Sequence, residues 1–193
     1  MTLHNGTSLI QPFSVEFDLE KGLMKNPKNY TARHASDMKG HYKDASALDA
    51  LIQNGDPLHY EVFECLPPEE YGQIFFCIST LQPGKVGDEY FMTKGHYHTV
   101  AHTGELYLCL RGEGFMLMKT ADGQFASQPF YRGAMVYVPP YWAHRSVNTG
   151  KEPLVSFCSY NAEAGHNYGD IEKEGFIKRV LEVNGKPEIR QDR

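Results

Sequence analysis

The sequence has few basic residues and no long apolar run, and each absence excludes a class of protein. There are 19 Lys and Arg against 24 Asp and Glu, which gives a formal net charge of −5. A nucleic-acid-binding surface needs a concentrated basic face, so we expect no nucleic-acid partner. No stretch approaches the roughly 18 apolar residues of a transmembrane helix, so we expect no membrane partner. The opening residues also lack the basic and apolar regions of a secretory signal.

Cysteine is scarce too, and its spacing argues against disulfide frameworks and zinc fingers. The four cysteines at positions 65, 77, 109 and 158 form no CxxC pair. A chain of 193 residues can bury a full core without covalent cross-links. We therefore expect reduced thiols, which is typical of a cytoplasmic protein. Cys77, Cys109 and Cys158 lie in apolar runs, where a free cysteine behaves as a small hydrophobic residue.

Aromatic residues, glycine and proline, in contrast, are plentiful, with 12 Tyr, 11 Phe, 18 Gly and 11 Pro. This mixture suits short strands and tight turns. From position 58 onward, strand-like segments are separated by turn-forming residues; they cover residues 59–63, 73–81, 105–111, 115–119, 125–131, 135–138 and 154–160. Residues 176–183 are a further strand candidate, followed by a hairpin turn at Asn184-Gly185. The pattern predicts an all-β protein, either an antiparallel sandwich or a small barrel.

The first 57 residues differ from the rest, because they are polar and only weakly periodic. We interpret residues 21–44 as an extended arm or loop. One helix is predicted over residues 44–54, where Ala47, Leu48 and Leu51 recur at helical spacing and either Asp44 or Ser46 can cap the start. We therefore expect one domain over residues 1–193. Its parts would be an N-terminal arm with a short helix (1–57), a barrel core (58–160) and a C-terminal extension (161–193).

The nine histidines are unevenly spread, since His96, His98 and His102 fall within seven residues. On a strand, residues i and i+2 point to the same face, so the imidazoles of His96 and His98 would converge as two ligands of one metal must. A hairpin could bring Glu105 beside them, and His144 offers a fourth ligand. We interpret His102 as an ordinary surface or core histidine. Three imidazoles and a carboxylate leave positions open on an octahedral ion, as catalysis by direct substrate binding requires.

The segment that begins at Glu105 has two different faces. Glu105, Tyr107 and Cys109 would share one face of a strand, and Leu106, Leu108 and Leu110 would share the other. If the first face looks into the metal site, the leucine face must pack on a second sheet or on a partner subunit.

The residues around the histidines resemble the two motifs of the cupin family. The first motif is matched by Gly95, His96, His98, Glu105 and Gly112, and the second by Gly133, Pro139, His144 and Asn148. Two departures, Tyr141 in place of a common glycine and a long gap between His98 and Glu105, are features of one subfamily. So are the strings YFMTKGHYH (90–98), PPYWAHR (139–145), AGHNYG (164–169) and, more weakly, SDMKG (36–40). On these residues the sequence resembles the cupin-type glucose-6-phosphate isomerases, which occur mainly in archaea and in some bacteria.

The resemblance implies a fold, a metal and an assembly. The fold would be an all-β cupin, a small double-stranded β-helix or jelly-roll barrel, with one or two short helices. Each subunit would bind one divalent metal through His96, His98, Glu105 and His144; we expect iron(II), with nickel, manganese, cobalt and zinc as candidates. The protein would be a cytoplasmic homodimer that acts in glycolysis and gluconeogenesis, with the N-terminal arm contributing to the dimer.

The implied reaction is the aldose–ketose exchange between glucose 6-phosphate and fructose 6-phosphate. Glu105 and Tyr160 would be catalytic, and the sugar phosphate would be bound by Tyr60, Ser79, Thr93, Gly95, Tyr107, His166 and Tyr168. Among these, Thr93, Gly95, His166 and Tyr168 correspond to phosphate contacts of the family, whereas Tyr107 and Tyr160 would face the sugar.

Two questions stay open at this point. Either Glu105 acts as the base of a cis-enediol route, or it is only a ligand in a metal-assisted hydride shift. The protein could also be a cupin iron(II) dioxygenase, which shares three histidines and a glutamate, or a non-catalytic sugar-binding cupin. The dioxygenase does not account for the longer strings around positions 90–98 and 164–169, and non-catalytic cupins often lose metal ligands, whereas all four are present here.

Overall fold

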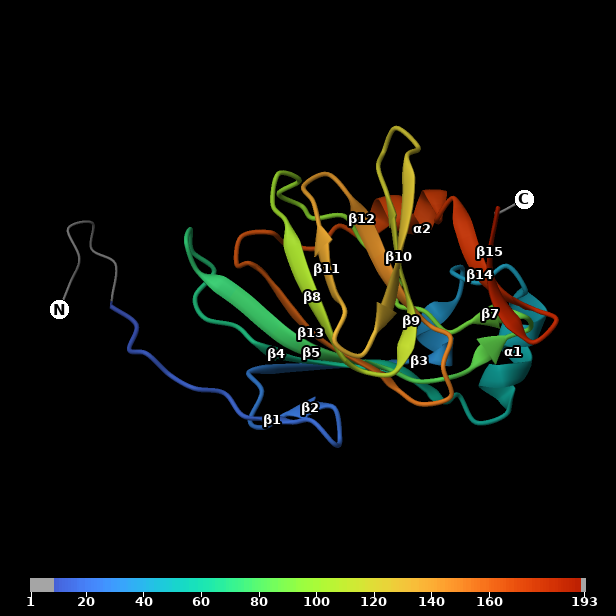
Figure 1. Cartoon of the computed structure of the whole chain (residues 1–193), viewed down its shortest axis with the longest axis horizontal. Helices are drawn as coiled ribbons and strands as arrows, with labels where there is room; N and C mark the ends of the chain where they lie inside the picture. The colour runs from blue at the N-terminus through green and yellow to red at the C-terminus, as the bar shows by residue number, and fades with distance from the viewer. Residues whose placement is uncertain (1–8, 192–193) are drawn as a thin grey trace.

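Two antiparallel sheets face each other in the computed structural model, which describes residues 9–191, and they enclose the core as the walls of a barrel (Figure 1). The larger sheet has six strands in the order β11 (Met135–Val138), β8 (Glu105–Arg111), β13 (Leu154–Asn161), β5 (Ile74–Leu81), β4 (Leu58–Cys65) and β3 (Asn29–His34). The facing sheet has three, in the order β10 (Phe125–Tyr131), β9 (Glu113–Lys119) and β12 (Ala143–Asn148). The all-β prediction is therefore confirmed.

Smaller elements flank the barrel. A four-stranded sheet has the order β15 (Lys186–Gln191), β14 (Lys178–Val183), β7 (Glu89–Tyr90) and β6 (Lys85–Val86), and a two-stranded ribbon joins β1 (Phe17–Asp18) to β2 (Leu23–Met24). The helices are η1 (Ala35–Met38), α1 (Ala45–Gln53) and α2 (Gly169–Glu174). In the part of the chain that the structure covers, no helix has the length and apolar character needed to cross a membrane.

Several predicted elements lie where expected. Strands β8, β10 and β11 begin and end at the predicted residues. Helix α1 is capped by Asp44, whose carboxylate accepts a hydrogen bond of 2.9 Å from the Ala47 amide, and it buries Leu48. Strands β14 and β15 form the predicted hairpin, in which Asn184 and Gly185 both have positive φ, as a two-residue turn of this kind requires.

Besides the two-residue strands, two longer strands were not expected from the sequence, and each has a physical reason. Strand β3 falls in the segment interpreted as an arm or loop; it is an edge strand that pairs only with β4, and its alternation of polar and apolar residues is weak. Strand β12 is buried at all six positions, including His144, Arg145 and Asn148, so it shows no contrast between an apolar and a polar face. Residues 1–8 of the expected arm and residues 192–193 of the expected extension lie outside the described part of the chain.

Candidate metal and substrate site

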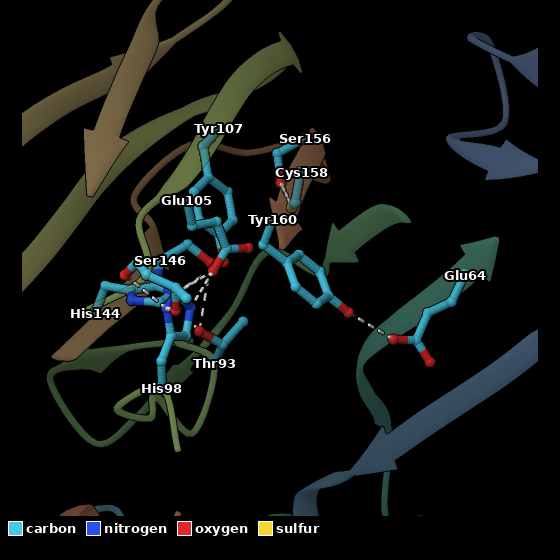
Figure 2. A network of polar contacts seen from close by, with 11 residues as sticks. Glu64, Thr93, His98, Glu105, Tyr107, His144, Ser146, Ser156, Cys158 and Tyr160 are labelled. Atoms are coloured by element: carbon cyan, nitrogen blue, oxygen red, sulfur yellow. Dashed lines mark hydrogen bonds and ion pairs between the residues drawn. The ribbon is translucent and has the colours of Figure 1, made fainter. Parts of the chain in front are cut away.

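A group of four buried side chains lies between the two sheets, at one end of the barrel. His96, His98, Glu105 and His144 each offer one ligand atom, and these atoms all lie within 4.8 Å of one another. Glu105 Oε2 is 3.0 Å from His98 Nε2 and 3.0 Å from His144 Nε2 (Figure 2). The structure therefore brings together all four residues predicted as metal ligands.

The backbone that holds the four residues differs in part from the expectation. Glu105 begins β8 and His144 lies in β12, on the facing sheet. His96 and His98 lie outside the named strands; His96 makes a single antiparallel bridge to His144, with N–O distances of 3.3 and 3.1 Å. The His-x-His pair is therefore held in place by the bridge between His96 and His144 of β12. The expected hairpin between a strand at His96–His98 and the strand at Glu105 is not formed.

Thr103 fixes the orientation of the His98 ring. The backbone carbonyl of Thr103 is 3.1 Å from His98 Nδ1, and its hydroxyl is 2.9 Å from the same atom. A hydrogen bond from Nδ1–H to the carbonyl leaves Nε2 as the lone-pair atom, which already faces Glu105. This arrangement prepares His98 to bind a cation through Nε2.

The protonation of Glu105 and His96 is shifted in the direction that favours a bound cation, whereas the Glu105 carboxylate raises the pKa of His98 above its usual value. Burial alone would raise the pKa of Glu105, but the imidazoles of His144 and His98 lower it well below its usual range. Burial and the neighbouring imidazoles lower the pKa of His96 well below 6.5. At neutral pH the group therefore holds a carboxylate and a neutral His96, both of which are electron-pair donors.

The donor set fits a divalent transition metal. Imidazole nitrogen together with carboxylate oxygen suits iron, nickel, manganese, cobalt and zinc. Within residues 9–191, His96 Nε2 is a buried polar atom with no hydrogen-bond partner, which is costly unless a cation or a water completes it. The cluster could therefore hold one metal ion.

A pocket opens onto this cluster between β3, β4, β5, β8, β13 and the segment before His96. Every residue predicted to bind substrate lines it: Tyr60, Ser79, Thr93, Gly95, Tyr107, His166 and Tyr168, together with Tyr160. His96, Glu105 and His144 line the same pocket. The residues come from segments more than 100 positions apart, and the barrel brings them to one cavity.

Comparison with known proteins agrees with this geometry. The family model "Glucose-6-phosphate isomerase (GPI)" matches residues 32–193. The chain belongs to the glucose-6-phosphate isomerase family. Glucose-6-phosphate isomerase from Thermococcus litoralis is 44% identical over 182 residues, covering 94% of this chain and 95% of the relative, and the enzyme from Thermococcus gammatolerans is 45% identical over 179 residues, covering 93% and 94%. A solved structure of oxalate oxidase with glycolate has a TM-score of 0.50 at 16% identity, covering 61% of this chain and 58% of that one, which supports the cupin fold alone.

One family feature of the sequence has a backbone explanation. Tyr141 stands where cupin motifs commonly have glycine, and its φ is +71°. This left-handed conformation is easy for glycine and uncommon for other residues. The Tyr141 side chain is 65% exposed, and its amide donates a 2.7 Å hydrogen bond to the Ala101 carbonyl. The turn that leads into His144 therefore keeps the glycine-like conformation without the glycine.

Sequence reasoning missed several residues that line the pocket: Thr31, Arg33, Val62, Glu64, Cys77, Lys94, Ser146 and Cys158. Two of them lie in or near strings that the family shares and could have been found that way. Lys94 is inside the 90–98 string, and Arg33 is three residues before the SDMKG string. Glu64, Cys77 and Cys158 carry no local signal. They enter the pocket because β4, β5 and β13 are neighbours, with Cys77 directly opposite both Cys158 and Glu64.

Tyrosine hydroxyls give the pocket its polar lining near the metal cluster. The Tyr107 hydroxyl is 3.1 Å from His144 Nε2, and the Tyr160 hydroxyl donates a 3.3 Å hydrogen bond to Glu64 (Figure 2). Burial raises the pKa of both tyrosines well above 10. Both side chains therefore keep their protons at neutral pH.

Proposed function

We infer that this protein is a metal-dependent aldose–ketose isomerase that interconverts glucose 6-phosphate and fructose 6-phosphate. The observation that carries this inference is the buried group of His96, His98, Glu105 and His144 at one end of a polar pocket, in a chain that belongs to this isomerase family. The reaction moves one hydrogen between C1 and C2 and exchanges a carbonyl with a neighbouring hydroxyl. It therefore needs a group that polarises the carbonyl and donors that hold the hydroxyls.

The residues of the chain divide this work. When bound to His96, His98, Glu105 and His144, a divalent metal would polarise the substrate carbonyl and stabilise negative charge on its oxygen. Tyr107 and Tyr160, which line the pocket, would donate hydrogen bonds to sugar hydroxyls near that centre.

The role of Glu105 distinguishes two routes. In the enediol route its carboxylate would remove a proton from one carbon and return it to the next, which requires it to loosen from the metal. In the hydride route it stays a ligand throughout. Running the reaction in deuterated water separates them, because deuterium at C1 or C2 of the product supports the enediol route and complete retention of the original hydrogen supports the hydride route.

Removing the metal is the direct test of the proposed function. We expect glucose 6-phosphate isomerisation to disappear after treatment with a chelator and to return when a divalent ion is added, because the imidazoles and the carboxylate left behind cannot supply the positive charge of the metal. The measurement is fructose 6-phosphate formation before chelation, after it and after reconstitution. Activity that survives complete metal removal would contradict the proposal. Oxygen uptake on another substrate would favour a cupin dioxygenase, and binding without turnover would favour a sugar-binding module.

We propose iron(II) as the resident ion, with nickel, manganese, cobalt or zinc as replacements. What supports iron is the donor set of three imidazoles and one carboxylate in which no thiolate takes part, since thiolates would favour zinc or copper. Elemental analysis of the protein purified without chelator, followed by reconstitution with each ion, identifies the metal that gives the highest activity.

We propose that two copies of the chain associate through the outer face of the six-stranded sheet. That face is apolar on β11 and β8, where Met135 pairs with Leu108. On β13 and β5 the N-terminal ribbon covers it, since Phe17 packs on Phe157 and Ile78 is buried. Met135 and Tyr137 are each 60% exposed in the single chain. A contiguous apolar face of this kind is typical of a subunit interface. The N-terminal segment after residue 8 extends away from the barrel and carries exposed Phe13, so it is available to contact a second copy (Figure 1).

Sedimentation tests this assembly. We expect a dimer at micromolar concentration and a shift to monomer in Met135→Asp, because the new carboxylate would have to be buried without a partner. Gln128→Asp is the matched control: it also places a carboxylate at an exposed strand position, on β10. A wild-type protein that sediments only as a monomer, or equal behaviour of the two variants, would contradict the proposal.

We also propose that the chain acts as one cupin domain in the cytoplasm. Support comes from the four cysteines, which are buried as free thiols and suit a reducing compartment. The arm (1–57), barrel (58–160) and extension (161–193) would be parts of that one unit. The partner of the pocket would be a sugar phosphate, with no role for nucleic acid.

A further inference from the structure

Arg33 is a cation in the pocket that the reaction described above does not use. It lies on β3, directly opposite Tyr60 on β4, and its side chain lines the pocket. Burial raises the pKa of the Tyr60 and Tyr168 hydroxyls, and the positive charge of Arg33 acts against that rise at both. Among the ion pairs found within residues 9–191, none involves Arg33. A pocket-lining guanidinium without an acidic partner is available to bind an anion.

The surroundings of Arg33 are those of an anion site. Thr93, Lys94 and Gly95 line the pocket in the same region as Tyr60 and Tyr168. Gly95 has φ +77°, which turns the chain here. Beneath this turn, the buried guanidinium of Arg145 donates a 2.5 Å hydrogen bond to the Lys94 carbonyl and stacks 4.0 Å from the centre of the Phe176 ring. The Lys94 carbonyl is therefore hydrogen-bonded on the core side of the turn, and the Arg145 guanidinium places another positive charge close to the turn.

Strand β4, which pairs with β3, carries a negative charge at the end far from Arg33. Glu64 lies four residues after Tyr60 on β4, so the two positions are about 13 Å apart along the strand. Glu64 also lines the pocket, where it accepts hydrogen bonds from Asn29 Nδ2 at 2.5 Å and from the Tyr160 hydroxyl. Figure 2 shows the Tyr160 ring pointing away from the metal cluster toward the carboxylate of Glu64. A phosphate would be repelled at Glu64 and attracted at Arg33.

Tyr168 connects the Arg33 end to the metal cluster. Its ring lies 5.4 Å from that of His96 and stacks with that of His166 at 5.9 Å. Tyr168 therefore lies beside a metal ligand and within reach of the charge of Arg33.

We propose that Arg33 binds the phosphate of the substrate and so sets its direction in the pocket, with the phosphate at β3 and carbons 1 and 2 at the metal cluster. This rests on the proposed function for the identity of the substrate. It means that the N-terminal segment, through β3, completes the binding site. It also makes the pocket selective for sugars with an anionic end, because the guanidinium and the Lys94 ammonium are poorly matched to a neutral hydroxyl.

The test compares Arg33→Gln with Arg33→Lys and with Arg132→Gln, a control in the exposed turn before β11. Loss of one charge-assisted phosphate contact is expected to raise KM for glucose 6-phosphate about 10- to 100-fold, with a smaller effect on kcat. Inhibition by inorganic phosphate should weaken by a similar factor. Arg33→Lys should recover part of both effects, because it restores the charge and loses the forked geometry. Arg132→Gln should match the wild type.

The outcomes separate this inference from the proposed function. Wild-type KM and wild-type phosphate inhibition in Arg33→Gln would overturn the role of Arg33 while leaving the isomerase intact. A fall in kcat with unchanged phosphate inhibition would also overturn it, since it would assign Arg33 to the support of β3. If the wild type does not isomerise glucose 6-phosphate, the proposed function fails; calorimetry with inorganic phosphate on the same three variants and the wild type then decides whether Arg33 binds the anion.

Discussion

Replacing His144 with alanine is expected to lower kcat by more than about a thousandfold while the protein stays folded. His144 Nε2 lies 3.0 Å from Glu105 Oε2 and faces His96, so its loss removes one of four ligands and leaves the buried carboxylate with fewer partners. Metal-assisted charge stabilisation is worth several kcal/mol, and each 1.36 kcal/mol is tenfold in rate. The core does not depend on the metal, because a chain of 193 residues buries enough apolar surface by itself.

The matched control for His144→Ala is His102→Ala. His102 is exposed and lies close in sequence to His96 and His98, yet it is not part of the four-residue group. We expect it to retain metal, activity and circular dichroism. Metal content by elemental analysis, with kcat, decides the result: a His144→Ala protein that keeps both its metal and its activity would exclude the site.

Changing Gly95 to alanine is expected to have the next largest effect, on stability and activity together. Gly95 has φ +77°, where an L side chain costs about 1–2 kcal/mol. A Cβ there would also lie 2.7 Å from a ring atom of Phe176 and 3.0 Å from the His144 carbonyl. That carbonyl accepts the His96 amide, so relief of the contact moves two metal ligands. We expect a loss of about 3 kcal/mol of unfolding free energy and roughly a hundredfold loss of activity from misplaced ligands.

Gly133→Ala is a control that separates the cost of backbone strain from the cost of steric contact between the new Cβ and its neighbours. The φ of Gly133 is +87°, and a Cβ there would meet nothing within 4 Å. Gly133→Ala should therefore cost only the strain, about 1–2 kcal/mol, with activity retained. Urea unfolding curves and kcat for the two variants give the comparison. Equal losses in both would mean that the contacts around Gly95 do not position the ligands.

Prediction from the sequence was most successful where the determining residues are close together in the chain. His96 and His98 are two residues apart, and Glu105 and His144 lie in short strings with a fixed spacing, so the ligand set could be predicted before the fold. The strands β8, β10 and β11 could be placed because each is bounded by glycine, proline or a charged turn. The helix α1 was predicted because its cap, Asp44, and its apolar spacing agree.

Prediction from the sequence was least successful for elements whose placement depends on neighbouring strands of the barrel. Strand β12 is buried on both faces, so its periodicity is hidden, although it carries His144. Strand β3 is held by a single neighbour and was interpreted as an arm. The path of the His-x-His pair also depends on a partner strand, since His96 pairs with His144 and not with a hairpin.

The sequence by itself determined an all-β chain, its reduced cysteines, and the identities of a three-histidine, one-glutamate group with the tyrosines expected beside it. Only the tertiary structure decided that Arg33 and Glu64 share the pocket at opposite ends, and that Cys77 and Cys158 form part of its wall. The physical reason is that a pocket inside a barrel is assembled from strands that are distant in the chain. Local periodicity tells which face of a strand is buried, whereas the neighbours across the barrel are chosen by the pairing of whole strands.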